Sequence, residues 1–164
     1  MIIVGFDPGL ATLGYGVIEK GKSLKPSMID YGVISTPKTE NLAVRLCMLE
    51  EGVKQIVAKF KPDEIAVEEL FFSKNITTGI NVAHARGVLL LTAVKECGRL
   101  YEYTPLQIKQ ALTGYGRADK RQIQAMVKSY LNLKSVPRPD DAADALAVAL
   151  CHAQTNKLGK LFSI

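Results

Sequence analysis

The sequence predicts an α/β domain with a mixed sheet and helices on both of its faces. Three short apolar segments open the chain with turn residues between them, which is typical of antiparallel strands. Longer segments with helical periodicity follow, and two further strand-like segments lie between them. Strands that come first and then alternate with helices indicate a sheet covered on both sides.

Five segments have the length and apolar character of strands. The first ends at Asp7-Pro8-Gly9, and a turn near Gly21 separates the next two, so we expect these three to form an antiparallel meander. The later two lie between helices, as in a mixed sheet. The predicted strands are Ile2–Phe6, Gly14–Ile18, Met28–Ile34, Glu64–Leu70 and Arg99–Tyr103.

The helical segments are marked by their apolar period and by their ends. Gly98 and Gly114 each follow a helical segment, and glycine is common just past a helix. Asp119 and Gln122 have the spacing of a capping box, and Pro139 suits the first turn of the last helix. The predicted helices are Asn41–Lys59, Ile80–Cys97, Ile108–Leu112, Asp119–Leu131 and Asp140–His152.

The bulk composition is that of one globular domain, which we expect to span residues 1–164. Hydrophobic residues make up 48% and charged residues 23% of the chain, which argues against disorder. No apolar run is long enough to span a bilayer and no basic segment opens the chain, so a soluble cytoplasmic protein is expected. The three cysteines form no C-x-x-C pair and are expected to be free thiols. The net charge of +5 fits a nucleic-acid ligand but does not single one out.

Acidic side chains occur in the strands at positions where they are costly. Asp7 ends the first apolar strand, and Glu68 and Glu69 lie within the fourth. A carboxylate buried alone tends to take up a proton, and several converging carboxylates repel one another. Hard divalent cations such as Mg²⁺ bind oxygen ligands of this kind, so the pattern indicates a metal site.

The last predicted helix adds further acids at its alanine-rich start. Asp141 and Asp144 are three residues apart, so they share one face of the helix. Asp140 and Asp144 are four residues apart and share a face equally well, so spacing alone leaves both pairs open. With acids from two neighbouring strands, either pair would form a two-metal site with ions roughly 3.5–4 Å apart.

Each acid also has a purely structural interpretation. Asp7-Pro8-Gly9 is a common turn, and acids that open a helix often serve as caps. Glu68 and Glu69 could be solvated at the end of their strand. Asp144, one turn into a helix among alanines, is the hardest to explain in this way. The combination of acids, not any one of them, favours the metal site.

A series of short motifs runs along nearly the whole chain. They are Gly5-Phe6-Asp7-Pro8-Gly9 with Gly14-Tyr15-Gly16, Ala66-Val67-Glu68 with Phe71 and Asn75, Ala85-Arg86-Gly87, Tyr103-Thr104-Pro105, Ile108-Lys109 with Gly114-Tyr115-Gly116, Ala118-Asp119-Lys120, and Asp141-Ala142-Ala143-Asp144-Ala145-Leu146-Ala147. A lone Asp-x-Gly is weak evidence. In this order and spacing, however, the motifs resemble the RuvC family of crossover junction endodeoxyribonucleases, the Holliday junction resolvases.

The resemblance implies an RNase H-like fold with a mixed five-stranded sheet, and a homodimer that nicks four-way DNA junctions symmetrically. It implies two-metal phosphodiester hydrolysis with two Mg²⁺ ions, for which Mn²⁺ substitutes, and a RuvA–RuvB branch-migration complex as a partner. It assigns the metal ligands, which are also catalytic, to Asp7, Glu68, Asp141 and Asp144. The adjacent acids Asp140 and Asp141 leave room for a shift of register in this assignment.

The resemblance also implies which residues contact DNA. It points to Phe71, Asn75, Arg86, Lys109 and Lys120. Phe71 is expected to stack on an unpaired base near the junction centre. Lys109 and Lys120 are expected to bind phosphate and to act in catalysis by stabilising charge near the cleaved bond. Without the resemblance, the aromatic side chain would be assigned to the core and the lysines to the solvated surface.

The predicted helix Ile80–Cys97 is apolar around much of its circumference. Such a helix is expected to be buried, either in its own core or against a partner helix. The resemblance implies that it forms the dimer contact. Two-fold symmetry would then match a symmetric junction.

Three other functions share part of this pattern. Actin-like and sugar-kinase ATPases also begin with a strand and Asp-x-Gly, but they need two such domains, and this chain has room for one. A non-catalytic binder of junction DNA would gain affinity by losing the acids. Shorter RuvC-like nucleases act on ribosomal RNA precursors, and here Phe71, Lys109 and Lys120 favour the junction enzyme.

Overall fold

The computed structural model describes residues 1–21, 25–69 and 76–155, and its centre is a five-stranded sheet in the order β3-β2-β1-β4-β5. Strands β1 (Ile2–Asp7), β2 (Thr12–Glu19) and β3 (Ser27–Ser35) pair antiparallel. Strands β4 (Glu64–Glu68) and β5 (Leu100–Tyr103) extend the sheet parallel to β1. The mixed sheet and its opening meander are therefore confirmed.

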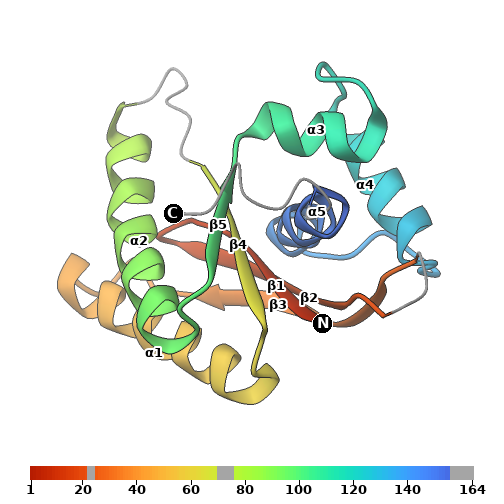
Figure 1. Cartoon of the computed structure of the whole chain (residues 1–164). Helices are drawn as coiled ribbons and strands as arrows, with labels where there is room; N and C mark the ends of the chain where they lie inside the picture. Colours follow the sequence, from red (N-terminus) through yellow and green to blue (C-terminus); the bar gives the residue numbers. More distant parts are fainter. Residues whose placement is uncertain (22–24, 70–75, 156–164) are drawn as a thin grey trace.

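Helices cover both faces of this sheet (Figure 1). One face packs against α1 (Leu42–Phe60) and α2 (Ile76–Glu96), and the other carries α3 (Pro105–Thr113), α4 (Lys120–Tyr130) and α5 (Asp140–Thr155). Alternate residues of a strand point to opposite faces, so β1 feeds two cores. Val4 and Phe6 join the core with α1 and α2, whereas Ile3 joins the core with α5.

The ends of three helices differ from the sequence-based prediction. Helix α2 begins at Ile76 instead of Ile80, and α5 continues to Thr155. Helix α3 begins at Pro105, after a capping box in which Thr104 and Gln107 bond reciprocally. The expected capping box of Asp119 with Gln122 at the start of α4 is confirmed.

Helix α5 lies directly on β1 and β2 because glycines face it there. A Cβ atom added at Gly14 would lie 2.0 Å from the carbonyl oxygen of Asp141, and one at Gly5 would lie 2.2 Å from that of Ala145. At Gly16 an added Cβ would meet Leu146 at 2.7 Å. Since these are contacts of backbone with backbone or with a fully buried leucine, they fix both the depth and the rotation of the helix.

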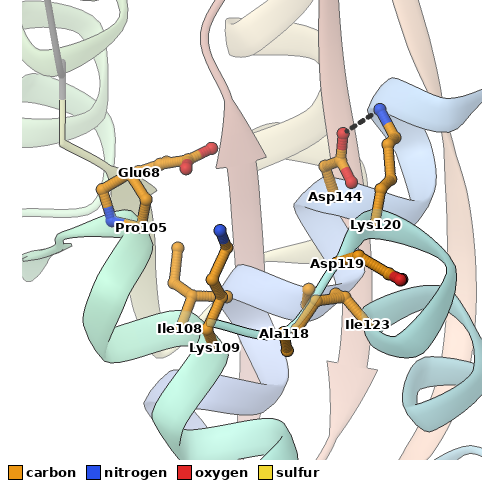
Figure 2. Close-up of a pocket in the computed structure, with 10 residues that line it drawn as sticks. Glu68, Pro105, Ile108, Lys109, Ala118, Asp119, Lys120, Ile123 and Asp144 are labelled. Carbon is orange, nitrogen blue, oxygen red and sulfur yellow. Dashed lines mark hydrogen bonds and ion pairs between the residues drawn. The ribbon is translucent and has the colours of Figure 1, made fainter. Parts of the chain in front are cut away.

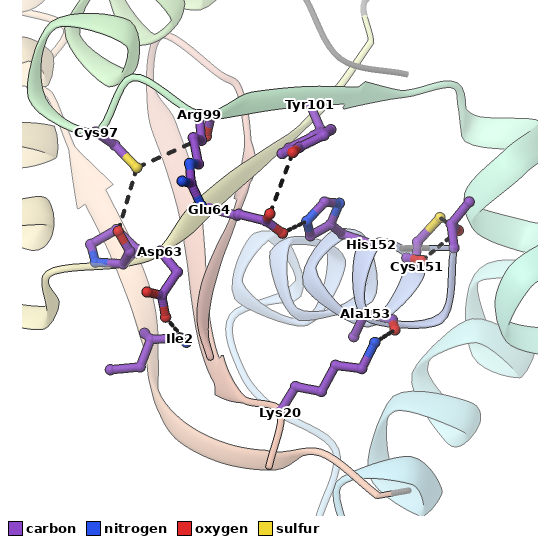
Figure 3. A network of polar contacts seen from close by, with 12 residues as sticks. Ile2, Lys20, Asp63, Glu64, Cys97, Arg99, Tyr101, Cys151, His152 and Ala153 are labelled. Atoms are coloured by element: carbon purple, nitrogen blue, oxygen red, sulfur yellow. Dashed lines mark hydrogen bonds and ion pairs between the residues drawn. The ribbon is translucent and has the colours of Figure 1, made fainter. Parts of the chain in front are cut away.

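The other end of α5 is anchored by a buried polar network (Figure 3). His152 is 1% exposed, and its ring nitrogens lie 2.7 Å from a carboxylate oxygen of Glu64 on β4 and 2.7 Å from the hydroxyl of Tyr103 on β5. Burial lowers the pKa of His152, which favours the neutral ring. A neutral ring donates to Glu64 through one nitrogen and accepts the Tyr103 hydroxyl proton at the other. The network therefore ties α5 to β4 and β5.

The three cysteines Cys47, Cys97 and Cys151 are free thiols, as the sequence predicted. Cys47 is exposed and Cys151 is buried in α5. Within the described segments, no helix has both the length and the apolar character that crossing a membrane requires.

Candidate active site

Asp7 and Glu68 stand side by side at the ends of two adjacent parallel strands. Phe6 of β1 is in register with Val67 of β4, so Asp7 and Glu68 are the next pair along the sheet. Phe6 and Val67 are buried beneath α1 and α2. Because side chains alternate along a strand, the two carboxylates point to the opposite face, toward α5.

Helix α5 brings two further carboxylates to this edge of the sheet. It begins at Asp140, so Asp141 and Asp144 both lie near its N-terminus, where the helix dipole favours negative charge. The contact of the Asp141 carbonyl with Gly14 of β2 holds this turn against the sheet. The charges of Glu68, Asp141 and Asp144 all act on Asp7. Four acids from three elements thus converge, with Asp7 at the centre.

Burial and mutual repulsion make this group of carboxylates hard to ionise. Burial, and then the charges of Glu68, Asp144 and Asp141, raise the pKa of Asp7 well above its usual range. Burial and the charge of Asp144 raise the pKa of Glu68 to about 7, although a hydrogen bond with Asp7 and the charges of Lys109 and Lys120 oppose the shift. A cation among them would favour the ionised forms.

Two lysines provide positive charge beside the acids. Lys120 donates a hydrogen bond of 3.0 Å to a carboxylate oxygen of Asp144. Lys109 and Lys120 line a pocket of about 220 Å³ together with Glu68 and Asp144. Figure 2 shows the Lys109 side chain directed toward the space between Glu68 and Asp144. The structure therefore brings both predicted lysines to the predicted acids.

The geometry separates the adjacent acids Asp140 and Asp141. Asp140 accepts a hydrogen bond of 3.1 Å from Gln124 on α4 and forms ion pairs with Arg138 and Lys120. Slight burial raises the pKa of Asp140, but the charges of Lys120 and Arg138 outweigh it and lower the pKa overall. Asp141 instead raises the pKa of Asp7 by its charge. Asp140 is thus held by Arg138, Lys120 and Gln124, whereas the charge of Asp141 acts on Asp7; the charges of both acids act on Asp144.

The donor set fits a hard divalent cation in its chemistry. All four side chains offer carboxylate oxygens, the ligands that Mg²⁺ and Mn²⁺ accept. Within residues 1–21, 25–69 and 76–155, no three acidic, histidine or cysteine side chains are arranged to hold an ion as they stand. Asp144 instead accepts a hydrogen bond from Lys120, which Figure 2 shows. Holding an ion would require Asp144 to exchange this partner for the metal.

Of the remaining predicted residues, only Arg86 lies in the part of the chain that the structure describes. Phe71 and Asn75 lie outside the described residues. Arg86 of α2 forms an ion pair with Glu102 of β5, and both side chains are largely buried. Glu69 has an exposed side chain, while its backbone N–H donates to the carbonyl of Tyr103 at 2.8 Å.

Sequence analysis missed a second hollow beside the acids. It has a volume of about 670 Å³, and Lys38, Arg45 and Asn81 line it together with Asp141. No motif marks Lys38 or Arg45, and a lone basic residue after a strand or in a helix is usually a solvated surface residue. Only the folded structure places them next to Asp141.

The sheet order β3-β2-β1-β4-β5, with helices on both faces, is that of an RNase H-like α/β protein. The acids at the ends of β1 and β4 and at the start of α5 place the candidate active site at one edge of this sheet.

The chain belongs to the RuvC family of crossover junction endodeoxyribonucleases, whose family model matches residues 3–152. Crossover junction endodeoxyribonuclease RuvC of Clostridioides difficile is 55% identical over 160 residues, covering 98% of this chain and 94% of the relative. The protein of the same name from Alkaliphilus oremlandii is 52% identical, covering 100% and 99%. The structure of Thermus thermophilus RuvC in complex with a Holliday junction substrate superposes with a TM-score of 0.93 at 36% identity, covering 100% of this chain and 99% of that one.

Proposed function

We propose that this chain resolves four-way DNA junctions by hydrolysing phosphodiester bonds at Asp7, Glu68, Asp141 and Asp144. The observation that carries the proposal is the convergence of these four carboxylates on Asp7, since such a group is unfavourable at neutral pH without a cation. The names of the relatives support the reaction, and the Thermus thermophilus complex supports the substrate. We also propose that the chain acts in the cytoplasm, with a RuvA–RuvB branch-migration complex as partner.

The cofactor that we propose is a pair of Mg²⁺ ions, for which Mn²⁺ would substitute. The four carboxylates would hold them, because their oxygens match the preference of hard cations. Such ions supply activation of the attacking water and stabilisation of the leaving 3′ oxygen. Asp141 is the proposed ligand, and Asp140 is not, because Asp140 is held by Arg138 and Gln124 and is not among the charges that raise the pKa of Asp7.

The chain's own basic residues would position the DNA. Lys109 would contact the phosphate next to the cleaved bond, because its side chain is directed between Glu68 and Asp144. Lys120 would hold Asp144 until a cation replaces it, and would then be free to bind phosphate. We propose DNA contacts for Phe71 and Asn75 as well. For Arg86 we propose that its main role is the ion pair with Glu102, which joins α2 to β5. This pair would lie beside the bound DNA.

The direct test of this function is incubation of the purified protein with a labelled four-way junction and with linear duplex of the same sequence, with and without Mg²⁺. Paired nicks in the junction, dependent on Mg²⁺ and absent from the linear duplex, are expected. Cleavage of both DNAs at equal rates would contradict a junction-specific enzyme. ATP hydrolysis in the absence of DNA would favour the ATPase alternative instead.

Replacing Lys109 with alanine is expected to slow junction cleavage by about 100-fold, because a charge near the cleaved bond is lost. Affinity for the junction should change little, since one phosphate contact among many is removed. Single-turnover cleavage rates separate the two effects. Lys54→Ala serves as the control, because Lys54 lies on α1 and pairs with Glu50 instead of an active-site acid. A Lys109→Ala rate equal to that of the control would mean that Lys109 is a solvated surface residue with no role in cleavage.

We propose that the protein is a homodimer that pairs through α2. Ile80, Leu91 and Val94 of α2 are 49%, 58% and 50% exposed, which is unusual for large apolar side chains. Exposed His84 and Gly87 lie between them, so the exposed residues follow a heptad spacing along one face. At Gly87 an added Cβ would meet nothing of the same chain within 4 Å, which leaves room for a partner helix.

Leu91→Glu is expected to convert the dimer to a monomer, because it places a charge in the centre of the proposed apolar contact. Sedimentation velocity at micromolar concentration would detect the change. Gln55→Glu on α1 is a matched control, since Gln55 is exposed and lies outside the α2 face. A Leu91→Glu protein that sediments like the wild type would rule out this face as the dimer contact.

A further inference from the structure

The second hollow lies next to the candidate active site, on the side away from the lysine-lined pocket. The lysine-lined pocket includes Glu68 and Asp144, whereas the hollow of about 670 Å³ includes Asp141 and the turn after β1. Each hollow is therefore lined in part by acids of the active site, but no acid lines both hollows. Glu68 and Asp144 thus line one hollow, and Asp141 lines the other.

Arg45 is held in a fixed position in this hollow. Its Nε donates a hydrogen bond of 2.9 Å to the hydroxyl of Thr36, and that hydroxyl donates one of 2.6 Å to the carbonyl of Leu10. Thr36 is 5% exposed, and its backbone N–H donates to the carbonyl of Ala11 at 3.0 Å. The guanidinium is therefore tied to the turn that follows Asp7. Among the residues that the structure describes, its two terminal NH₂ groups make no hydrogen bond or ion pair, so they can bind a ligand in the hollow, in the planar geometry that suits phosphate.

The basic residues of the hollow differ from several others of the protein. Lys54, Lys59, Arg86, Lys120 and Arg138 all pair with carboxylates. Across the described parts of the chain, neither Lys38 nor Arg45 has a carboxylate oxygen within 4.0 Å of its charged nitrogens. Helices α1 and α2 also begin beside the hollow without an acidic residue in their first turns, which adds partial positive charge.

We propose that this hollow is a second DNA backbone site, in which Lys38 and Arg45 bind phosphates of the cleaved strand on the far side of the cut from Lys109. The proposal rests on the proposed function. It defines the course of the cleaved DNA strand across the protein surface. A phosphate at the four carboxylates has neighbouring phosphates on either side along the same strand. One flank would lie over the pocket with Lys109 and Lys120, and the other over the hollow with Lys38 and Arg45.

The fixed position of Arg45 gives this site a positioning role. Because Arg45 and Asp7 are joined through Thr36 and the turn after β1, a phosphate bound at Arg45 is held at a set distance from the acids. Asn81 of α2 lines the same hollow and offers an amide for a further hydrogen bond to the backbone. Contacts of this kind set the register of a strand without selecting its sequence.

The double variant Lys38→Gln/Arg45→Gln tests the proposal. Junction affinity is measured without divalent ions, so that no cleavage occurs, over a range of salt concentrations. Each lost phosphate contact should lower the slope of log Kd against log salt by about 0.9, so the double variant should lose roughly two units. The control variant Lys54→Gln/Arg99→Gln removes the same amount of charge from residues that do not line the hollow. It should retain the wild-type slope.

A second measurement locates the contact along the strand. Single methylphosphonate groups, which are uncharged, are placed at successive positions on each side of the cut. On the flank opposite the Lys109 side, one or two positions should weaken wild-type binding by about tenfold. The same substitution should have no further effect in the double variant, because the partner is already gone.

Each result separates this proposal from the proposed function. If the wild type cleaves junctions but the double variant keeps the wild-type salt slope, the second site is wrong and the function stands. If the wild type does not cleave junctions but the slope still falls, the function is wrong and the hollow remains a nucleic-acid site. Should loss of the Thr36 bond lower the stability of the double variant, Lys38→Gln alone carries the test, with an expected loss of about one unit of slope. An unchanged slope in that variant would also overturn the proposal.

Discussion

Asp7→Asn is expected to reduce Mg²⁺-dependent junction cleavage by about 10³-fold or more while leaving junction binding intact. Asparagine keeps the shape of the side chain but removes its charge. Asp7 is the residue on which the charges of Glu68, Asp141 and Asp144 all act, so its loss affects the whole group. Single-turnover cleavage and binding without divalent ions measure the two properties separately. Binding should be equal or tighter, because a negative charge near the phosphates is gone.

Glu69→Gln is the matched control for this variant. Glu69 follows Glu68 directly, but its side chain is exposed and the alternation of the strand directs it away from α5. Removal of its charge should leave the cleavage rate within about twofold of wild type, as for most surface substitutions. If Asp7→Asn and Glu69→Gln retained equal activity, Asp7 would have no place in the active site.

Asp7→Asn should also stabilise the metal-free protein at neutral and alkaline pH. Burial and the neighbouring acids raise the pKa of Asp7 above its ordinary value of 3.8. A carboxyl group with a raised folded pKa favours folding below its unfolded pKa, and this contribution is lost as the pH rises through the folded pKa. The free energy of unfolding of Asp7→Asn should therefore exceed that of wild type at about pH 8, and the difference should vanish in acid. Urea unfolding in EDTA measures it, and a less stable variant at about pH 8 would contradict the electrostatic account.

Gly14→Ala is expected to destabilise the protein by about 3 kcal/mol, at the upper end of what overpacking costs. The added methyl group would lie 2.0 Å from the carbonyl oxygen of Asp141, and a backbone atom cannot move aside alone. Either α5 shifts or the sheet does. Thermal unfolding should show a midpoint lowered by about 6–12 °C. Because the shift moves Asp141 and Asp144 away from Asp7, cleavage should fall as well.

Gly87→Ala provides the comparison for Gly14→Ala. An added Cβ at Gly87 meets nothing of the same chain within 4 Å, and Gly87 lies within α2. Because Gly87 also lies on the proposed dimer face, both substitutions are compared in the monomeric Leu91→Glu background. There alanine, the better helix former by about 0.5–1 kcal/mol, should leave the protein as stable as its parent or more so. Equal destabilisation by the two substitutions would show that the close contact of α5 with β2 is not what matters at Gly14.

Much of the sheet could be predicted from the sequence because its signals are local. Strand β1 is an apolar run with a turn after it, and the alternation of side chains along β1 and β4 decides that Asp7 and Glu68 share a face. The pairing that makes them neighbours is a long-range contact, with Phe6 beside Val67, and it follows only from the assembled sheet. The sequence analysis therefore named the acids, and the fold gives their arrangement.

The errors at helix starts have two different causes. Helix α2 begins at Ile76, four residues before Ile80, and its first turn runs through Thr77, Thr78 and Gly79. These residues are poor helix formers, so propensity gives no sign of this turn. For α3 the signal is present in the sequence, although the predicted helix begins at Ile108. Thr104 and Gln107 have the spacing of a capping box around Pro105, as Asp119 and Gln122 have at α4.

The choice between Asp140 and Asp141 as metal ligand could not be predicted from helical periodicity. Both acids share a helical face with Asp144, so spacing cannot separate them. The contact of Gly14 with the carbonyl of Asp141 sets the rotation of α5, and that rotation turns Asp140 toward Arg138 and Gln124. The hollow with Lys38 and Arg45 was likewise out of reach, because it joins the segment before α1 to the turn after β1.

The most direct test of the whole account is the thermal unfolding midpoint as Mg²⁺ is raised through the millimolar range at constant ionic strength. A cation that binds only the folded state stabilises it in proportion to RT ln(1 + [Mg²⁺]/Kd). The wild type and Glu69→Gln should become progressively more stable, whereas Asp7→Asn should respond weakly or not at all. An identical rise in all three proteins, or none in the wild type, would mean that the clustered carboxylates do not bind the metal on which the proposed chemistry depends.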